Sequence, residues 1–259
     1  MKQKVIYYSD EINDEFSGTH ITPRIIDEKY NYSKNPVWDF CSYLIQNVFS
    51  MPIKVIYAKL KFNLKFEGKE KLKPYKKQGY FIYLNHTQNF LDTFLPSLAV
   101  FPKRNFLIVN PENISLKGTG WLVEMLGAIP TPNTKNATKN FLKQMEKRIK
   151  NGSSITIYPE AHIWPYYTKI RNFKAVSFKY PVKLNVPCFC ITNTYQKDSK
   201  TGKVKMISYI DGPFFSQNKS SEKESCEDLR NKVYDAMTKR CQNSNVEVIE
   251  YRKKDDAKK

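Results

Sequence analysis

Short apolar runs alternate with amphipathic segments along most of this chain, and this alternation constrains its fold more than any other feature. Residues 80–84 are a continuous apolar run of the kind found in buried strands, and residues 154–158 are a second strand-like run. Residues 134–150 instead repeat an apolar residue every fourth position, as an amphipathic helix does. The order of such elements predicts an α/β fold, with a mixed, partly parallel sheet flanked by helices on both faces.

The remaining elements follow from the same patterns. Further strands are expected at 61–66, 105–109, 127–131, 187–194 and 203–210. Further helices are expected at 90–100, at 116–126, at 174–184 with an interruption at Pro181, and from Ser221, where Ser221 and Glu224 form a capping box. A chain of 259 residues can bury one sizeable core. We therefore expect an N-terminal extension with an amphipathic helical segment (1–60), one α/β domain (61–250) and a basic tail (251–259).

The most apolar part of the extension, residues 37–60, is too interrupted to cross a membrane. A membrane span needs roughly 18 or more uninterrupted apolar residues, and polar residues divide this segment at Asp39, Gln46, Asn47, Lys54 and Lys59. Pro52 is expected to break or kink a helix here. Two short helices in the membrane interface, with their lysines at the headgroups, fit this pattern. A helical hairpin packed on the domain's own core fits it equally well. Residues 1–30 lack the apolar core of a signal peptide.

The charge balance favours an anionic partner. Forty-three Lys and Arg face 25 Asp and Glu, which gives a formal net charge of +18. Such an excess suits either nucleic acid or an anionic membrane surface. Composition alone does not choose between them.

The five cysteines argue against a disulfide framework and against a metal site. Cys41, Cys188, Cys190, Cys226 and Cys241 show no CxxC spacing and no clustered histidines. We expect them to be reduced and mostly buried, in keeping with a cytosolic environment.

Two polar segments follow directly after predicted strands and carry two of the chain's three histidines. The first is Asn85-His86-Thr87-Gln88-Asn89-Phe90-Leu91-Asp92, and the second is Tyr158-Pro159-Glu160-Ala161-His162. A histidine with a carboxylate close by can deprotonate a hydroxyl, because the carboxylate holds the imidazole tautomer and stabilises its protonated form. The third histidine, His20, has no neighbour that suggests chemistry.

The order of these motifs resembles the glycerolipid acyltransferase family, which includes 1-acyl-glycerol-3-phosphate acyltransferases. That family has a His-x4-Asp motif, an apolar strand after a glycine, a Phe-Pro-Glu-Gly-Thr-Arg motif and an apolar strand with Val-Pro. The corresponding segments here contain His86 and Asp92, residues 126–131, Pro159-Glu160, and residues 186–191. The resemblance covers about residues 55–215.

Two departures from the family pattern concern the acceptor. The first motif is one residue longer here, as His86-x5-Asp92, and Ala161-His162-Ile163 replaces Gly-Thr-Arg. Asn133 stands where the second motif of the family ends in arginine. The family's arginines are associated with an acceptor phosphate, so their absence leaves open whether the acceptor carries one or whether other cations, such as Arg171 and Lys174, bind it.

The resemblance implies an O-acyltransferase that moves a fatty acyl group from a thioester, either acyl-CoA or acyl carrier protein, to a lysolipid hydroxyl. It implies His86 as general base and Asp92 as its partner, with no metal and no cofactor beyond the thioester co-substrate. The expected substrate-binding residues are Glu160, His162, Arg171, Lys174 and Asn133. We expect a peripheral protein on the cytoplasmic face of a membrane, without a nucleic-acid partner. The alternative is a non-catalytic basic protein that binds anionic lipid or nucleic acid, since the +18 charge and 14% aromatic content also suit that function.

Overall fold

The computed structural model describes residues 4–18, 21–199, 201–217 and 219–254. Within them, seven strands form one sheet in the order β2-β8-β7-β3-β6-β4-β5, and two more, β1 and β9, pair separately. The strands of the large sheet are β2 (Lys65–Glu67), β3 (Tyr80–Leu84), β4 (Asn105–Val109), β5 (Ala128–Pro130), β6 (Ser154–Ile157), β7 (Cys188–Lys197) and β8 (Val204–Phe214). The helices are α1 (Pro36–Leu44), α2 (Ser50–Phe62), α3 (Leu95–Val100), α4 (Gly120–Met125), α5 (Lys135–Lys150), α6 (Lys179–Leu184) and α7 (Glu222–Cys241).

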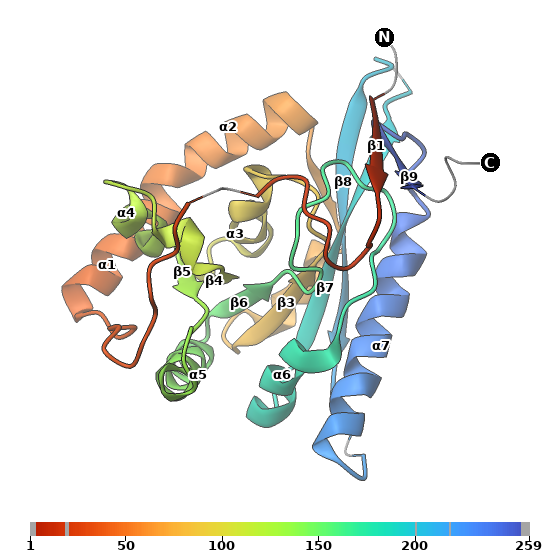
Figure 1. Cartoon of the computed structure of the whole chain (residues 1–259). Helices are drawn as coiled ribbons and strands as arrows, with labels where there is room; N and C mark the ends of the chain where they lie inside the picture. Colours follow the sequence, from red (N-terminus) through yellow and green to blue (C-terminus); the bar gives the residue numbers. More distant parts are fainter. Residues whose placement is uncertain (1–3, 19–20, 200, 218, 255–259) are drawn as a thin grey trace.

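The sheet separates two apolar layers, because successive side chains of a strand point to opposite faces. Phe81 and Tyr83 of β3 pack in one cluster with apolar residues of α5 and α7. Tyr80, Ile82 and Leu84 pack in the other cluster with residues of α2 and α3. Helices α5 and α7 therefore cover one face of the sheet, and α2 and α3 cover the other (Figure 1).

The predicted fold class is confirmed in its α/β part. Strands β3, β4, β5 and β6 are all parallel to their neighbours, whereas β7 and β8, which correspond to the strands expected at 187–194 and 203–210, form an antiparallel pair. β3 and β4 have the predicted bounds. The last helix begins as predicted, because the Ser221 side chain accepts a hydrogen bond from the Glu224 N–H.

Residues 61–66 were expected to form a strand, and the structure differs there. Helix α2 continues to Phe62 and ends at Asn63, whose left-handed φ of 44° closes the helix. Only Lys65–Glu67 pairs with β8. The alternation of Phe62, Leu64 and Phe66 thus spans a helix end and a short strand, and both bury apolar side chains on the same cluster.

Pro52 does not break the helical segment, contrary to the sequence-based expectation. A π-helical stretch, η1 (Ile45–Phe49), joins α1 directly to α2. Pro52 falls in the first turn of α2, where a missing backbone N–H costs little. The segment is therefore one continuous helical rod rather than a hairpin.

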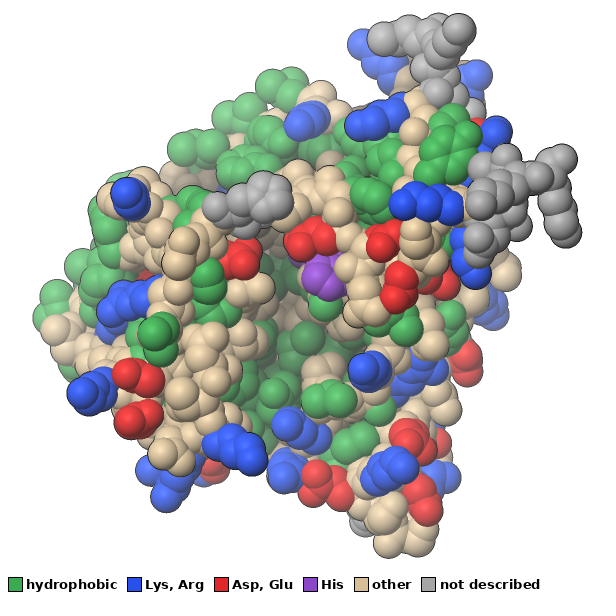
Figure 2. All heavy atoms as spheres, in the orientation of Figure 1, with side chains coloured by type: hydrophobic (Ala, Val, Ile, Leu, Met, Phe, Trp, Pro, Cys, Tyr) green, Lys and Arg blue, Asp and Glu red, His purple; other side chains and the backbone are tan. Residues whose placement is uncertain are grey.

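From α1 to the first turns of α2, the polarity of this rod is the reverse of that of an ordinary surface helix, whereas Ala58 and Phe62 at its end pack on the core. Its side toward the domain buries Ser42, Gln46, Asn47 and Lys54, and Gln46 donates to the carbonyl oxygens of Asn105 and Leu126 at 2.7 and 2.6 Å. Its outer side exposes large apolar side chains: Val37, Phe40, Tyr43, Val48, Phe49, Ile53, Val55, Ile56 and Leu60. Figure 2 shows hydrophobic side chains gathered over α2.

The N-terminal segment crosses the front of the molecule before the rod begins (Figure 1). It starts with β1 (Lys4–Tyr8), which pairs in parallel with β9 (Ile249–Lys253) near the other end of the chain. The periodicity of the sequence had not indicated this pairing. Residues 4–18 and 21–35, called the N-terminal strap below, then pass over loops that follow the carboxyl ends of the sheet strands.

Candidate active site

The two histidine segments meet at one edge of the sheet. Strands β3 and β6 are parallel neighbours, so the loops after Leu84 and Ile157 leave the sheet side by side. The His86 backbone N–H donates to Glu160 Oε2 at 2.9 Å, and the Trp164 N–H donates to the His86 carbonyl at 3.1 Å. Open α/β sheets bind ligands at this edge, outside the carboxyl ends of their strands.

His86 and Asp92 form a close pair. His86 Nδ1 lies 2.9 Å from Asp92 Oδ2, and the same oxygen accepts the Thr87 and Gln88 backbone N–H groups at 2.8 and 2.9 Å. The Asp92 side chain is fully buried, whereas the His86 side chain keeps 16% of its surface exposed. The loop therefore wraps around the carboxylate, and this accommodates the extra residue between the two side chains.

Tyr158 completes the surroundings of His86, although the sequence analysis did not select it. Its ring stacks on the imidazole with centroids 4.0 Å apart and planes 20° apart. Its hydroxyl donates to the Asp92 carbonyl oxygen at 2.6 Å. Burial, with the Asp92 charge as a smaller cause, raises the pKa of the Tyr158 hydroxyl well above its usual value, so Tyr158 stays a neutral donor. Its place at the end of β6, directly before Pro159-Glu160, was the available signal.

Glu160 and Arg171 form a buried ion pair beneath the His86 loop. Glu160 accepts the Arg171 backbone N–H at 2.9 Å on one oxygen and Arg171 Nη2 at 3.4 Å on the other. Burial raises the pKa of the Glu160 carboxyl, and the Arg171 charge opposes that shift. Arg171 also donates to the carbonyl oxygens of His162 and Glu11, so this guanidinium is directed at the protein.

The other predicted site residues lie at different distances from the His86–Asp92 and Glu160–Arg171 pairs. His162 keeps a third of its side chain exposed, and its Nδ1 lies 3.6 Å from Glu15 Oε2 of the N-terminal strap. Lys174 is exposed. Asn133 Oδ1 accepts the Ile26 N–H at 2.7 Å, so this side chain anchors the strap. His20 lies outside the described residues.

A second polar cluster holds the His86 loop from the side of β7. Asn85 and Asn193 exchange two hydrogen bonds, at 3.1 and 2.8 Å. The Tyr195 hydroxyl donates to Thr87 Oγ1 at 2.8 Å and accepts from Gln88 Nε2 at 2.9 Å. The loop is thus fixed on both sides before any ligand binds.

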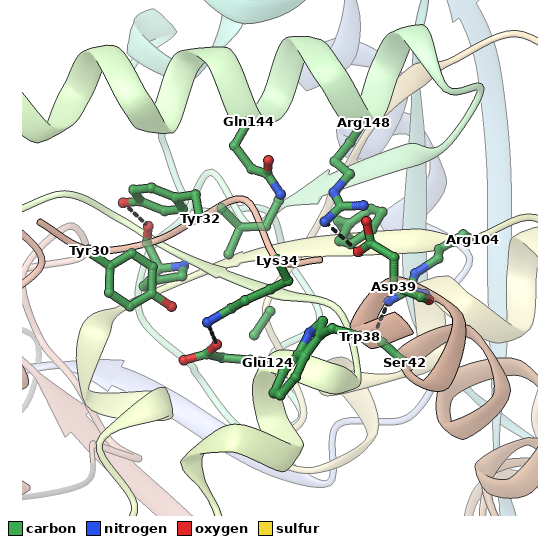
Figure 3. A pocket seen from close by; sticks show the side chains of 14 residues that line it. Tyr30, Tyr32, Lys34, Trp38, Asp39, Ser42, Arg104, Glu124, Gln144 and Arg148 are labelled. Atoms are coloured by element: carbon green, nitrogen blue, oxygen red, sulfur yellow. Dashed lines mark hydrogen bonds and ion pairs between the residues drawn. The ribbon is translucent and has the colours of Figure 1, made fainter. Parts of the chain in front are cut away.

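A separate pocket lies between the N-terminal strap, α1, α4 and α5 (Figure 3). Lys34 pairs with Glu124 at 2.8 Å, and Arg148 pairs with Asp39 at 2.9 Å. The cavity volume is about 30 Å³, which suits about two water molecules. The ion pairs across this pocket therefore help to hold the strap and the rod against α4 and α5.

The described residues contain no group of three or more His, Cys, Asp or Glu side chains arranged to hold a metal ion. Cys188, Cys190 and Cys226 are buried, and all five cysteines are free thiols. Burial raises the pKa of the Cys188 and Cys190 thiols well above the usual value, which disfavours the reactive thiolate.

Comparison with known proteins adds a family match. The family model described as Acyltransferase matches residues 63–193, half of the chain. No curated protein sequence matches significantly. Among solved structures, the crystal structure of the 1-acyl-sn-glycerophosphate (LPA) acyltransferase PlsC from Thermotoga maritima is similar, with a TM-score of 0.47 and 19% sequence identity. The match covers 78% of this chain and 95% of that one.

Proposed function

The chain belongs to the acyltransferase family, and on this premise we propose that it transfers a fatty acyl group from a thioester to a lysolipid hydroxyl, as in 1-acyl-glycerol-3-phosphate. The donor in this proposal is acyl-CoA or acyl carrier protein. The observation that carries the proposal is the 2.9 Å contact between His86 Nδ1 and Asp92 Oδ2 at the ligand-binding edge of the sheet.

In the proposed reaction, His86 acts as the general base. Asp92 accepts a hydrogen bond from Nδ1–H, which holds the imidazole in the tautomer whose Nε2 is the basic nitrogen. Nε2 takes the proton of the acceptor hydroxyl while that oxygen attacks the thioester carbonyl carbon. The tetrahedral intermediate then expels the thiolate, the C–S bond breaks, and the proton passes from Nε2 to the leaving sulfur. No acyl-enzyme is required, which agrees with the buried, protonated state of Cys188 and Cys190.

Glu160 and Arg171 act in this proposal as positioning residues. Their ion pair fixes the His86 backbone through the 2.9 Å bond to Glu160 Oε2, so a distortion of the pair would tilt the imidazole. The headgroup contacts fall to His162 and Lys174, because their polar atoms stay partly or fully exposed. Asn133 contributes through the strap that it anchors.

The proposed location is the surface of an anionic leaflet, on the cytoplasmic face. Among the described residues, no helix is both long and apolar enough to span a bilayer. The outward apolar side of the α1–η1–α2 rod supports peripheral attachment, because a contiguous exposed apolar surface marks a partner or membrane contact.

The decisive experiment is acyl transfer by purified His86→Ala and Asp92→Asn variants. Mass spectrometry would follow a mixture of lysolipids, with and without a headgroup phosphate, together with acyl thioesters of several chain lengths. We expect His86→Ala to lower kcat by about 10³-fold or more, because general-base catalysis typically contributes 10² to 10⁴-fold. Thermal unfolding would confirm that the variant is folded. Turnover near the wild-type rate in folded His86→Ala would refute the assignment.

A further inference from the structure

Helix α5 presents an uncompensated row of lysines. Lys135, Lys139, Lys143 and Lys147 follow one another at four-residue intervals, and all four are exposed. Within the described part of the chain, none of them has an ion-pair partner. Residues four apart are neighbours on a helix surface, so the lysines form a continuous positive row.

The first part of this row is unfavourable for the helix itself, whereas Lys147 lies in the last turn, where a cation is favourable. Like charges at four-residue spacing destabilise a helix, and cations in its first turn oppose the macrodipole. Helix α5 begins with Lys135 and has no acidic residue in its first turn. Helix α7, on the same face of the sheet, instead compensates its lysines, as in the 2.7 Å pair of Lys232 with Asp228 and the 3.9 Å pair of Lys223 with Glu227. The unpaired row is therefore a feature of α5 rather than of every exposed helix.

The row also lies on the opposite face of the sheet from α2, whereas α1, the first part of the rod, reaches α5 through the Asp39–Arg148 pair. Phe141, Met145 and Ile149 of α5 pack on the same cluster as Phe81, whereas Ala58 and Phe62 of α2 pack on the other face. If the outer side of α2 rests on a bilayer, the lysine row is directed away from it. A soluble anionic partner thus fits the row better than the membrane does.

The position of α5 suits delivery of the acyl donor. The chain enters α5 from the carboxyl end of β5, at the same edge of the sheet as His86. β5 lies three strand positions from β3, which is about 15 Å at ~4.8 Å per strand. The N-terminal end of the row, at Lys135, therefore lies at the same edge of the sheet as the His86 loop.

We propose that the α5 lysine row is the docking surface for an acidic carrier protein that brings the acyl thioester. This inference rests on the proposed function, because it assigns one of the two donors to a defined surface. Complementary charge on a partner helix would pair with the row and raise the association rate.

The test is the double variant Lys139→Glu/Lys143→Glu, compared with Lys223→Glu/Lys239→Glu on α7, which makes the same change in net charge. Each variant would be assayed with acyl carrier protein, with acyl-CoA and with an uncharged acyl-N-acetylcysteamine thioester. We expect the α5 variant to raise the KM for the carrier-linked donor about tenfold at unchanged kcat. Rates with the uncharged thioester should stay the same, and the α7 variant should resemble wild type.

Four outcomes would overturn the proposal. An unchanged KM for the carrier, or an equal rise in the α7 variant, would show that the row has no specific role in docking. An equal loss with acyl-CoA would assign the row to donor phosphates. Lost binding to phosphatidylglycerol vesicles, with the carrier KM unchanged, would assign it to the membrane.

Different results would refute the proposed docking site and the proposed reaction. A wild-type protein that transfers acyl groups from none of the three donors would contradict the proposed function. Direct binding of the carrier, measured by fluorescence anisotropy, would then still test the surface. Binding that is strong in wild type and weakened about tenfold only in the α5 variant supports docking, and equal binding in both refutes it.

Discussion

At the scale of single residues, the His86 imidazole is constrained from several directions before substrate arrives. Asp92 holds Nδ1, the Tyr158 ring covers one face, and Glu160 holds the backbone N–H. In the proposed reaction, preorganisation of this kind would lower the cost of reaching the transition state, because the proposed base would not need to be oriented during the reaction. The residues around His86 would therefore affect the proposed reaction by fixing the position of the imidazole.

Tyr158 offers a test of this positioning. Tyr158→Phe removes the 2.6 Å bond to the Asp92 carbonyl but keeps the stacked ring, so we expect kcat to fall only a few-fold and stability to fall by about 1 kcal/mol. Tyr158→Leu removes the ring as well, and kcat should fall at least about tenfold with KM little changed. Steady-state kinetics and thermal unfolding would separate the two effects. Equal kcat values for the Phe and Leu variants would show that ring stacking has no role.

At the scale of elements, the α1–η1–α2 rod is the least ordinary part of the fold. Its buried side makes hydrogen bonds to the domain, such as Gln46 Nε2 to the Asn105 carbonyl oxygen at 2.7 Å, while its apolar side faces outward. In water, an exposed apolar side gains nothing. In the membrane interface, burial of this side would stabilise the bound protein by roughly 25 cal/mol for each Å² of apolar surface removed from water.

Ile53 gives a direct test of this surface. Its side chain is 69% exposed, and burial in lipid is worth roughly 2 kcal/mol for such a residue, so Ile53→Asp should weaken binding to anionic vesicles about tenfold or more. Val176→Asp is the matched control, because Val176 is 63% exposed but lies outside the rod. Co-sedimentation with phosphatidylglycerol vesicles would measure both. Equal binding by the two variants would argue that the rod does not contact the bilayer.

At the scale of the whole molecule, segments from opposite ends of the described chain pack together on the loop that follows β6. β1 pairs with β9, and Trp164 lies between the two ends, with Tyr251 stacked on it at 5.0 Å and Phe16 at 5.1 Å edge-on. The Trp164 backbone N–H also donates a hydrogen bond to the His86 carbonyl oxygen. The strap and the C-terminal segment thus reach the His86 loop through one aromatic residue.

Tyr251→Ala should loosen this connection. It removes the stack on Trp164 and the 2.8 Å hydrogen bond to the Pro165 carbonyl, and we expect a loss of about 2 kcal/mol in stability. Hydrogen exchange should speed up in residues 4–18 and 249–253 and stay slow in β3 and β6. Uniformly faster exchange across β3 would instead show that the strap and the sheet unfold as one unit.

Several features of the site were predictable because they depend on local spacing or on strand ends. His86 and Asp92 are six residues apart, so one loop brings them together whatever the rest of the chain does. β3 and β6 could be recognised from strand-like runs, continuous and apolar in β3, which placed His86 and Glu160 at strand ends. The catalytic roles of these residues, and the division of the chain into three segments, stay predictions.

Other features depended on contacts between distant residues. The sequence alone determined the α/β alternation, the position of the His86 loop and the composition of the rod, because periodicity and turn residues act over a few residues. Only the tertiary structure decided that Arg171 is buried against Glu160, that Asn133 anchors the strap, and that β1 pairs with β9. The tertiary structure also turned the polar side of the rod inward. Burial and pairing are set by which surfaces meet across the whole chain, and no local pattern records that.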